Sequence, residues 1–419
     1  MSRRLTMIAL GSRGDVQPYV ALASGLLRAG HRVRMVTFES FRPMVESQGL
    51  DFHPVAGDAH ALVAMMMGGS GIGTRNPLVL MRSIMRSFGA LADAYIDAFS
   101  ADVLADSDAI LNQLPAGLFG ADVAEKLGVP HLMLSVIPLE QTAAFANPLL
   151  SSRSFGALGN RLTYSIAAQL LWAGFRPIMT RFRRRLGLSG GLPLWLRPRT
   201  DPVINGFSPL VVPPPPDWGA HIQTTGYWLL DEADWQPPAP LLDFLQAGDP
   251  PVFIGFGSMV ADDPARLTRL LIEAVDSAGC RAVFGKGWAN LGAEALPAHI
   301  HALDYTPYPW LLPRMAAVVH HGGSGTTGQA LRAGVPSMVV AFGTDPPFCG
   351  ARTAALGAGL PPLHIKSLTA EALARSLRTL LTDDGMRARA AELGASLRAE
   401  RGIETAIRII EGYVGGGGK

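Results

Sequence analysis

Short apolar stretches alternate with longer amphipathic stretches along most of the chain, in one series over residues 6–186 and a second over residues 252–401. The predicted strands are 6–10, 32–37, 109–112, 131–135, 252–256, 281–285, 316–319 and 337–341. The predicted helices are 18–29, 76–101, 119–127, 158–186, 264–278, 370–381 and 385–401. Regular alternation of strands and helices is typical of parallel sheets that are covered by helices. The pattern therefore predicts an α/β protein with two doubly wound, Rossmann-like domains.

The segment between the two series differs in composition, because prolines crowd residues 213–251. Proline-rich stretches are extended and semi-rigid, which suits a connection between two domains. We therefore predict an N-terminal domain at 1–212, a linker at 213–250, a C-terminal domain at 251–401, and a helix end with a flexible glycine tail at 402–419.

Composition limits the class of protein. Hydrophobic residues make up 48% and charged residues 17%, as in a globular chain, and a net charge of +2 gives no argument for nucleic-acid binding. Two cysteines, no CxxC pair and no HExxH motif argue against a disulfide framework and a zinc site. The first apolar run is too short for a signal peptide, and no apolar stretch reaches about 18 residues. We therefore expect a soluble, cytoplasmic protein.

The most informative motif follows the predicted strand 316–319 and precedes a predicted helix that begins near Thr326. A strand that runs through a glycine-rich turn into a helix N-terminus gathers free backbone N–H groups, which together with the helix dipole favour a phosphate. Two histidines and two threonines add side-chain donors there. The motif therefore predicts a nucleotide diphosphate site. Its residues are His320, His321, Gly322, Gly323, Ser324, Gly325 and Thr326.

Two further turns can contribute to such a site. The turn Gly11–Pro18 follows the first predicted strand and contains one acid, Asp15. This carboxylate can cap the next helix or serve as a general base, and the residues alone favour neither role. The glycine spacing does not match GxGxxG, so dinucleotide binding is poorly supported. The turn Gly255–Met259 follows the first strand of the second series and can add donors to the same diphosphate.

Taken together, the three motifs resemble those of the inverting nucleotide-sugar glycosyltransferases of the GT-B fold. Gly11–Pro18 is similar to the opening loop of the sterol and antibiotic-aglycone branch, and both 255–259 and 320–350 are similar to its donor-binding signature. Their order and spacing match over essentially the whole chain. The resemblance implies two Rossmann-like domains that face each other across a cleft, with the C-terminal helix crossing back to the first domain.

The resemblance also implies roles for individual residues. Asp15 stands where plant relatives have a histidine base, as in relatives that use aspartate. His321 matches the contact to the donor's α-phosphate, Gly325 and Thr326 match the β-phosphate contacts, and Asp345 matches the acid that binds sugar hydroxyls. The whole predicted donor set is Ser12, Gly257, Ser258, His320, His321, Gly322, Gly323, Ser324, Gly325, Thr326, Gln329 and Asp345.

Three departures from the family pattern leave the donor open. Pro346 replaces the usual glutamine after the sugar-binding acid, and proline offers no side-chain hydrogen bond. Cys349 replaces a tryptophan of the sterol branch, and Leu303 stands where plant relatives stack the base on tryptophan. The resemblance favours a UDP-sugar and leaves a TDP-sugar open. Neither a cofactor nor a metal is expected, since no convincing DxD-type motif is present.

The predicted first domain suggests a lipophilic acceptor, such as a sterol, hopanoid, macrolide, polyketide or flavonoid hydroxyl. The acceptor pocket is predicted at Met65, Met66, Phe88 and Phe145, with Phe155, Trp172 and Phe175 as further apolar wall. The basic cluster 181–185 is most simply interpreted as a solvated helix face. The alternative interpretation is peripheral contact with an anionic lipid surface. A monomer or weak dimer is expected.

Two alternatives to glycosyl transfer stay open. One is a nucleotide-sugar epimerase of the same architecture, which needs carboxylates around the sugar and no apolar acceptor pocket. The other is a catalytically silent protein that binds nucleotide sugars. Acceptor-dependent product formation distinguishes transfer from both.

Overall fold

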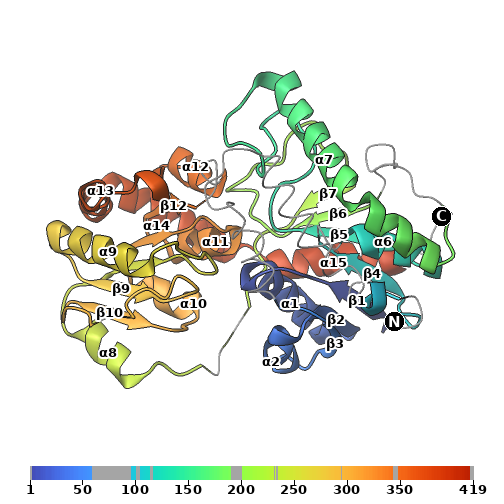
Figure 1. Ribbon diagram of the computed structural model, residues 1–419, viewed down its shortest axis with the longest axis horizontal. Coiled ribbons are helices and arrows are strands. Elements are labelled where there is room, and N and C mark those ends of the chain that lie inside the picture. Colours follow the sequence, from blue (N-terminus) through green and yellow to red (C-terminus); the bar gives the residue numbers. More distant parts are fainter. Residues whose placement is uncertain are drawn as a thin grey trace. The chain divides into compact units, whose positions relative to one another are not determined.

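The computed structural model describes residues 2–58, 96–100, 104–113, 117–189, 201–230, 232, 235–293, 295–342 and 348–415. It divides into two compact units (Figure 1). Met1–Leu230 and the returning segment Arg401–Lys419 form unit 1, and Asp231–Glu400 forms unit 2. Both units are parallel α/β structures, which confirms the predicted fold class.

Unit 1 is built on a parallel sheet, with the order β3-β2-β1-β4-β5-β6-β7 among its described residues. Its central strands β1 and β4 are almost wholly buried, as expected for a sheet covered on both faces. The strands are β1 (Arg4–Ile8), β2 (Arg32–Phe38), β3 (Asp51–Val55), β4 (Ala109–Asn112), β5 (His131–Ser135), β6 (Val203–Asn205) and β7 (Ile222–Thr224).

The described helices of unit 1 include α15, which comes from the C-terminal end of the chain and contacts α1 (Figure 1). A Cβ atom on Gly25 of α1 would lie 2.5 Å from Cγ2 of Ile403, so this glycine allows the two helices to approach closely. The C-terminal segment therefore returns to the first domain as predicted, but as a separate helix that follows the one predicted at 385–401. The helices are α1 (Arg13–Arg28), η1 (Glu39–Phe41), α2 (Arg42–Glu46), α6 (Gly117–Leu127), α7 (Gly156–Arg185) and α15 (Gly402–Gly415).

Unit 2 has a parallel sheet with the order β10-β9-β8-β11-β12-β13. Relative to its own first strand this is the order 3-2-1-4-5-6 of a dinucleotide-type Rossmann sheet. Its buried core includes Val252, Phe284, Val319 and Val340. The strands are β8 (Val252–Gly255), β9 (Ala282–Gly285), β10 (Ile300–Leu303), β11 (Ala317–His320), β12 (Ser337–Ala341) and β13 (Gly359–His364).

Helices cover both faces of this second sheet, and α9 and α13 pack against each other. Both have one apolar face, which supplies Leu271 and Val275 from α9 and Leu373 and Leu377 from α13 to the core. The helices are α8 (Ala239–Gln246), α9 (Pro264–Ala278), α10 (Tyr308–Leu311), η3 (Leu312–Arg314), α11 (Ser324–Ala333), α12 (Phe348–Ala355), η4 (Ile365–Ser367), α13 (Ala370–Thr382) and α14 (Asp384–Ala399).

Two details of the sequence prediction need correction. The first helix begins at Arg13 instead of Pro18, because Ser12 and Asp15 form a capping box one turn earlier. Pro18 then lies inside the helix, where it removes one backbone donor. Residues 213–250, predicted as a linker, contain β7 of unit 1 and α8 of unit 2, and the units divide after Leu230. Prolines start or flank these elements without preventing them.

Candidate functional site: two strand-end turns

The turns after β8 and β11 lie side by side in unit 2. These strands pair directly, with Gly255 opposite His320, and the strand order of the sheet reverses between them. Ligands of doubly wound sheets bind outside the carboxyl ends of the strands at such a reversal. The structure therefore brings the predicted turn Gly255–Met259 and the predicted motif 320–326 to the position at which a ligand is expected.

His321 lies between the two turns. A Cβ atom on Gly257 would lie 3.1 Å from its Cε1, and one on Gly323 would lie 2.6 Å from its Nε2. Both glycines therefore leave room that the imidazole fills, and Gly257 has a φ of 57° that suits glycine. Burial lowers the pKa of His321 to about 4. The ring is neutral at pH 7, and it can donate one hydrogen bond to a phosphate oxygen.

His320 supports the turn from inside the sheet. Its side chain is fully buried, and its Nδ1 accepts a hydrogen bond of 3.1 Å from the backbone N–H of Gly322. Gly322 has a φ of 90°, a conformation that glycine adopts readily. Burial, together with the neighbouring His321, lowers the pKa of His320 to about 3. We infer that His320, predicted as a donor ligand, fixes the turn and does not itself face the ligand.

The turn opens into the N-terminus of α11, whose first turn carries no acid and whose N-cap, Gly323, offers no side chain. Ser324, Gly325 and Thr326 occupy the first three helical positions. Their backbone N–H groups are those that a helix leaves without intrahelical partners. A Cβ atom on Gly325 would meet no protein atom within 4 Å. The start of α11 therefore presents open space and backbone donors at the same place.

Other predicted donor residues lie around this turn with less definite roles. Ser258 follows Gly257 in the opposite turn, and Gln329 lies half-buried on the second turn of α11. Asp345, predicted to hold the sugar, is outside the described residues. Sequence reasoning missed the turn after β9, where the backbone N–H of Trp288 donates to the Gly257 carbonyl at 2.9 Å. Its signal was the Gly-Lys-Gly run at 285–287, which directly follows a predicted strand.

In unit 1 the corresponding position holds the acid Asp15. The strand order reverses between β1 and β4, and Asp15 lies on the first turn of α1, which follows β1. Its Oδ2 accepts two hydrogen bonds of 2.8 Å, from the backbone N–H and from the hydroxyl of Ser12. Within the described structure Oδ1 accepts none. Ser12, predicted as a donor ligand, thus also holds the carboxylate.

The environment of Asp15 makes its carboxyl a weaker acid than that of an ordinary aspartate. Burial raises the pKa of this carboxyl, and the two hydrogen bonds from Ser12 offset part of that rise. Tyr19, one turn further along α1, is buried and donates its hydroxyl to the Leu134 carbonyl at 3.3 Å, so it does not compete for the carboxylate. A carboxylate with a raised pKa is a better proton acceptor than an ordinary aspartate. Capping and general-base chemistry are therefore compatible in Asp15.

The predicted acceptor residues are only partly described. Met65, Met66 and Phe88 lie outside the described residues. Phe145 is half-buried in the connection between β5 and α7. Trp172 and Phe175, expected as further apolar wall, are 8% and 1% exposed on α7 and belong to the core instead, because the inward face of this long helix needs large apolar side chains. Phe155 is 57% exposed.

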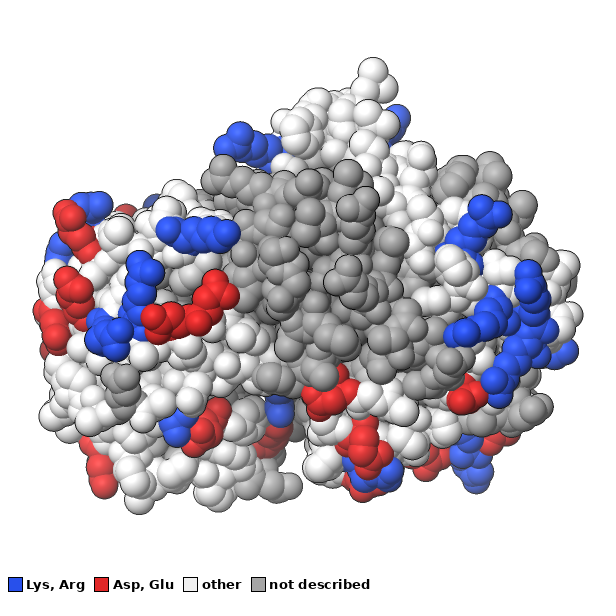
Figure 2. Space-filling model, in the orientation of Figure 1, with Lys and Arg blue, Asp and Glu red and all other residues white. Residues whose placement is uncertain are grey.

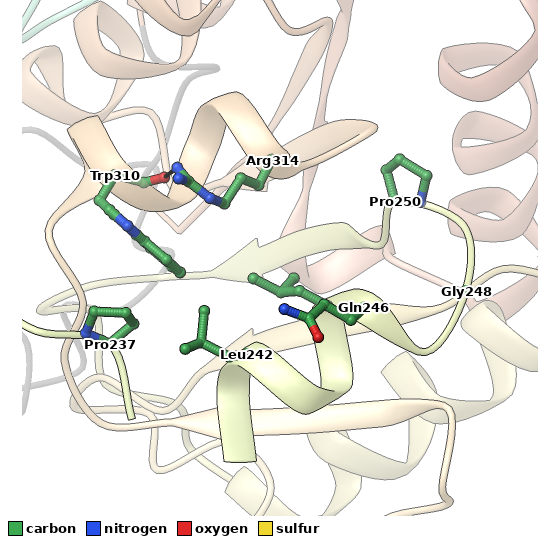
Figure 3. A pocket seen from close by; sticks show the side chains of 8 residues that line it. Pro237, Leu242, Gln246, Gly248, Pro250, Trp310 and Arg314 are labelled. Carbon is green, nitrogen blue, oxygen red and sulfur yellow. Dashed lines mark hydrogen bonds between the residues drawn. The ribbon is translucent and has the colours of Figure 1, made fainter. Parts of the chain in front are cut away.

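A separate pocket of about 520 Å³ lies in unit 2 between α8 and the α10–η3 segment. Figure 3 shows Leu242 and Gln246 of α8 opposite Trp310 and Arg314, and the Arg314 guanidinium stacks over the Trp310 ring at 4.1 Å. Pro250, which also lines it, precedes β8 and so marks the amino end of that strand. None of the predicted donor residues lines this pocket. It lies at the amino ends of the strands, whereas the His321 turn lies at their carboxyl ends.

Among the described residues, no cluster of three or more His, Cys, Asp or Glu could hold a metal ion. No described helix combines the length and the apolar character needed to cross a membrane. Cys280 and Cys349 are both free. The chemistry available at the two turns is therefore that of one carboxylate, one neutral imidazole, hydroxyls and backbone donors.

These two Rossmann-like units, each with a glycine-containing turn at its strand-order reversal, have the architecture of the GT-B class. Residues 5–145 match the glycosyltransferase family 28 N-terminal domain, and residues 287–409 match the erythromycin biosynthesis protein CIII-like C-terminal domain. The sterol 3-beta-glucosyltransferases of Neosartorya fischeri and Aspergillus fumigatus are each 37% identical to the chain over 98% of its length. The chain spans only 29% and 30% of those two proteins.

Solved structures agree on the fold. The kitacinnamycin glycotransferase has a TM-score of 0.74 at 18% identity, covering 99% of this chain and 100% of its own. The Streptomyces sp. SF2575 glycosyltransferase SsfS6, complexed with thymidine diphosphate, has a TM-score of 0.66 at 22% identity, covering 98% and 99%. The chain therefore belongs to the GT-B nucleotide-sugar glycosyltransferase family that includes the sterol and antibiotic-aglycone enzymes.

Proposed function

We propose that the chain transfers a sugar from a nucleoside diphosphate to a hydroxyl of a lipophilic acceptor, with inversion and without a metal ion. The observation that carries the proposal is the open N-terminus of α11, where Gly325 leaves open space and Gly323 makes room for the neutral imidazole of His321. A pyrophosphate fits backbone donors at a helix N-terminus. Fixed donors of this kind also stabilise the charge that develops on a leaving diphosphate.

Asp15 is the general base of the proposed reaction. Its Oδ1 takes the proton of the acceptor hydroxyl while the acceptor oxygen forms a bond to the anomeric carbon. The bond from that carbon to the diphosphate oxygen breaks, and the nucleoside diphosphate leaves with the electron pair. Ser12 holds Oδ2 through two hydrogen bonds, which fixes the orientation of the carboxylate. A single displacement inverts the anomeric configuration.

The donor is proposed as a UDP-sugar, with a TDP-sugar as the other nucleotide to test. The thymidine diphosphate bound to the related SsfS6 supports including the second nucleotide. Neutral donors such as the His321 imidazole and the backbone N–H groups of α11 contact the diphosphate and do not distinguish the two bases. Leu303, at the carboxyl end of β10, offers no aromatic ring for base stacking.

A lipophilic acceptor is proposed because the relatives with the highest identity named above are sterol 3-beta-glucosyltransferases. The choice among sterol, hopanoid, polyketide, macrolide and flavonoid hydroxyls is left to experiment. Phe145 is the described residue proposed to contact it.

The decisive experiment incubates the full chain with UDP- and TDP-sugars, with and without a panel of lipophilic alcohols, and follows the products by mass spectrometry. The proposal expects a glycoside only when donor and acceptor are both present, with inverted configuration by NMR and no loss of rate in EDTA. Isomerised donor without acceptor would establish the epimerase instead. Donor binding without any turnover across the panel would contradict the enzyme and favour a binding protein.

A further inference from the structure

Five large apolar side chains are exposed together at one end of unit 1. They are Leu149 (54% exposed), Phe155 (57%), Leu158 (84%), Leu162 (58%) and Ile166 (43%). Only two other large hydrophobic residues of the described structure are comparably exposed, Leu210 and Tyr305. Single exposed apolar residues are ordinary, but a contiguous group marks a surface that contacts something apolar. We call this group the apolar stripe.

The backbone that carries the apolar stripe is held in place by α7 and by hydrogen bonds of the preceding loop. Leu158, Leu162 and Ile166 are spaced by four residues on α7 and so share one face of the helix. The preceding loop is tied to the same turns by the buried Asn160, which donates to the Ala143 carbonyl at 2.8 Å and accepts from the Phe155 N–H at 2.8 Å. The exposure of the apolar stripe therefore results from the ordered structure of α7 and its preceding loop.

Charge on the same helix has one sign. The 30 residues of α7 include six arginines and no lysine, aspartate or glutamate. Arg176 and Arg184 on this helix and Arg153 in the loop before it are exposed, and within the described structure none of them pairs with a carboxylate. Arg183 and Arg185 are engaged, with Asp122 and Asp97 respectively.

Acidic residues near the stripe do not cancel this charge. Asp217 is paired with Arg161 at 2.9 Å, and Glu140 and Asp217 are the two carboxylates that act on the pKa of Tyr164, on the inward face of α7. In Figure 2, the uppermost surface, over the first half of α7, shows white and blue residues and no red ones. The exposed face of α7 thus runs from an apolar half to a basic half.

We propose that this face of unit 1 docks on an anionic lipid bilayer, with α7 in the interface plane. Leucine and phenylalanine side chains enter the boundary between headgroups and acyl chains, and unpaired arginines contact lipid phosphates. No described helix, α7 included, is long and apolar enough to cross a membrane. The proposal rests on unit 1 alone and holds whether or not the proposed sugar transfer is correct.

The test measures co-sedimentation of the full chain with vesicles of phosphatidylcholine alone and of phosphatidylcholine with phosphatidylglycerol. Wild type should bind the anionic vesicles, bind the neutral ones weakly, and lose affinity as salt rises. Leu158→Ser with Leu162→Ser should weaken binding at least tenfold, since each apolar group removed from the interface reduces the partition coefficient several-fold. Arg176→Gln with Arg184→Gln should weaken it by roughly 30-fold at low salt.

Matched controls use exposed residues away from the stripe. Tyr305→Ser removes an exposed ring of unit 2, and Arg32→Gln removes an exposed charge at the start of β2. Both should bind vesicles as wild type does, and all variants should unfold at the wild-type temperature. Failure of wild type to bind anionic vesicles, or wild-type binding by both double variants, overturns the proposal. So does a leucine-dependent dimer, seen by analytical ultracentrifugation, whose disruption leaves vesicle binding unchanged.

Discussion

The turns after β1 and β11 are built alike but differ in chemistry. Each lies where the strand order of its sheet reverses, and each leads through a glycine-containing turn into a helix N-terminus. The second helical position is Gly14 in one and Gly325 in the other, and the third is Asp15 in one and Thr326 in the other. The residue at the third helical position therefore makes the main chemical difference, an acid in the turn after β1 and no acid in the turn after β11.

This difference decides what each turn can bind. In α1 the acid satisfies the backbone donor of the N-cap, and the helix start is occupied by its own side chain. In α11 no acid stands in the first turn, so the backbone donors and the positive end of the helix dipole are left for an external anion. In the proposed reaction, the same structural element thus supplies a base in unit 1 and an anion site in unit 2.

The largest expected effect comes from removing the acid. Asp15→Asn keeps an oxygen that can accept from Ser12 but removes the proton acceptor, so turnover should fall by roughly 10²- to 10⁴-fold. Affinity for UDP, measured by titration calorimetry, should stay within about twofold, since the donor contacts proposed above belong mainly to unit 2. Because burial disfavours the charged form of Asp15, the variant should be no less stable at pH 7.

A matched control for this variant is Glu39→Gln. Glu39 is the acid that follows β2, is exposed, and pairs with Arg42 at 2.6 Å. Its removal should leave turnover within about twofold, as is usual for exposed surface pairs. Equal losses in the two variants, or near-normal turnover of Asp15→Asn, would show that Asp15 only caps its helix.

The second prediction converts the open turn into a closed one. Thr326→Asp places an acid at the third position of α11, where Asp15 stands in α1. The new carboxylate would repel the donor diphosphate and weaken its binding by about 100-fold or more, as expected for like charges roughly 4 Å apart near a protein surface. Helix stability should stay equal or rise slightly. Calorimetry with UDP and thermal unfolding measure both effects.

Thr326→Ala serves as the control, because it removes the hydroxyl without adding charge. Its loss of donor affinity should be about tenfold or less, the usual contribution of one hydrogen bond. A Thr326→Asp variant that binds UDP as Thr326→Ala does would rule out the start of α11 as the diphosphate site.

Much of this comparison could be predicted from the sequence, because its signals are local. The buried central strands β1, β4, β8 and β11 are largely apolar and were predicted to within two residues, as were the glycine-bearing turns that follow β1, β8 and β11. The edge strands β3, β7, β10 and β13 were not predicted. Edge strands are half-exposed and less apolar, and β3 and β13 also contain prolines.

The candidate site was harder to predict than its turns. Nothing local in the sequence tells which of the adjacent histidines faces a ligand. The sheet distinguishes their surroundings, because His320 ends β11 with its side chain buried while His321 lies beside Gly257 of the neighbouring turn. The position of the first helix start was also missed, since Pro18 is a stronger local signal than the Ser12–Asp15 capping box.

A third prediction separates space for the ligand from space for His321. Gly323→Ala would put a Cβ atom 2.6 Å from Nε2 of His321 and displace the ring, which should lower both stability and donor affinity. Gly325→Ala would meet no protein atom within 4 Å. At a helical position it should raise the free energy of unfolding by about 0.4–1 kcal/mol. Its donor affinity should nevertheless fall by about tenfold, because the methyl group takes the place of a phosphate oxygen.

The two alanine variants are each other's control in denaturant unfolding and calorimetry. Opposite changes in stability with a shared loss of UDP affinity support an anion at the start of α11. Full UDP affinity in Gly325→Ala would mean that the open space beside this glycine is not occupied by the donor.

The smallest effect is a shift of the pH profile through Ser12. The carboxylate of Asp15 must be ionised to accept a proton, so turnover rises with pH through its pKa, which burial raises above 3.8. The Ser12 hydroxyl donates to Oδ2 and favours the ionised form, so Ser12→Ala should raise this pKa further. The acid limb of kcat/KM should move to higher pH, while turnover above the limb stays within a few-fold of wild type. Ser12→Ala should leave the pKa of His321 unchanged, since that pKa is lowered to about 4 by the burial of His321 itself. An acid limb that stays in place in Ser12→Ala would mean that a group other than Asp15 sets it.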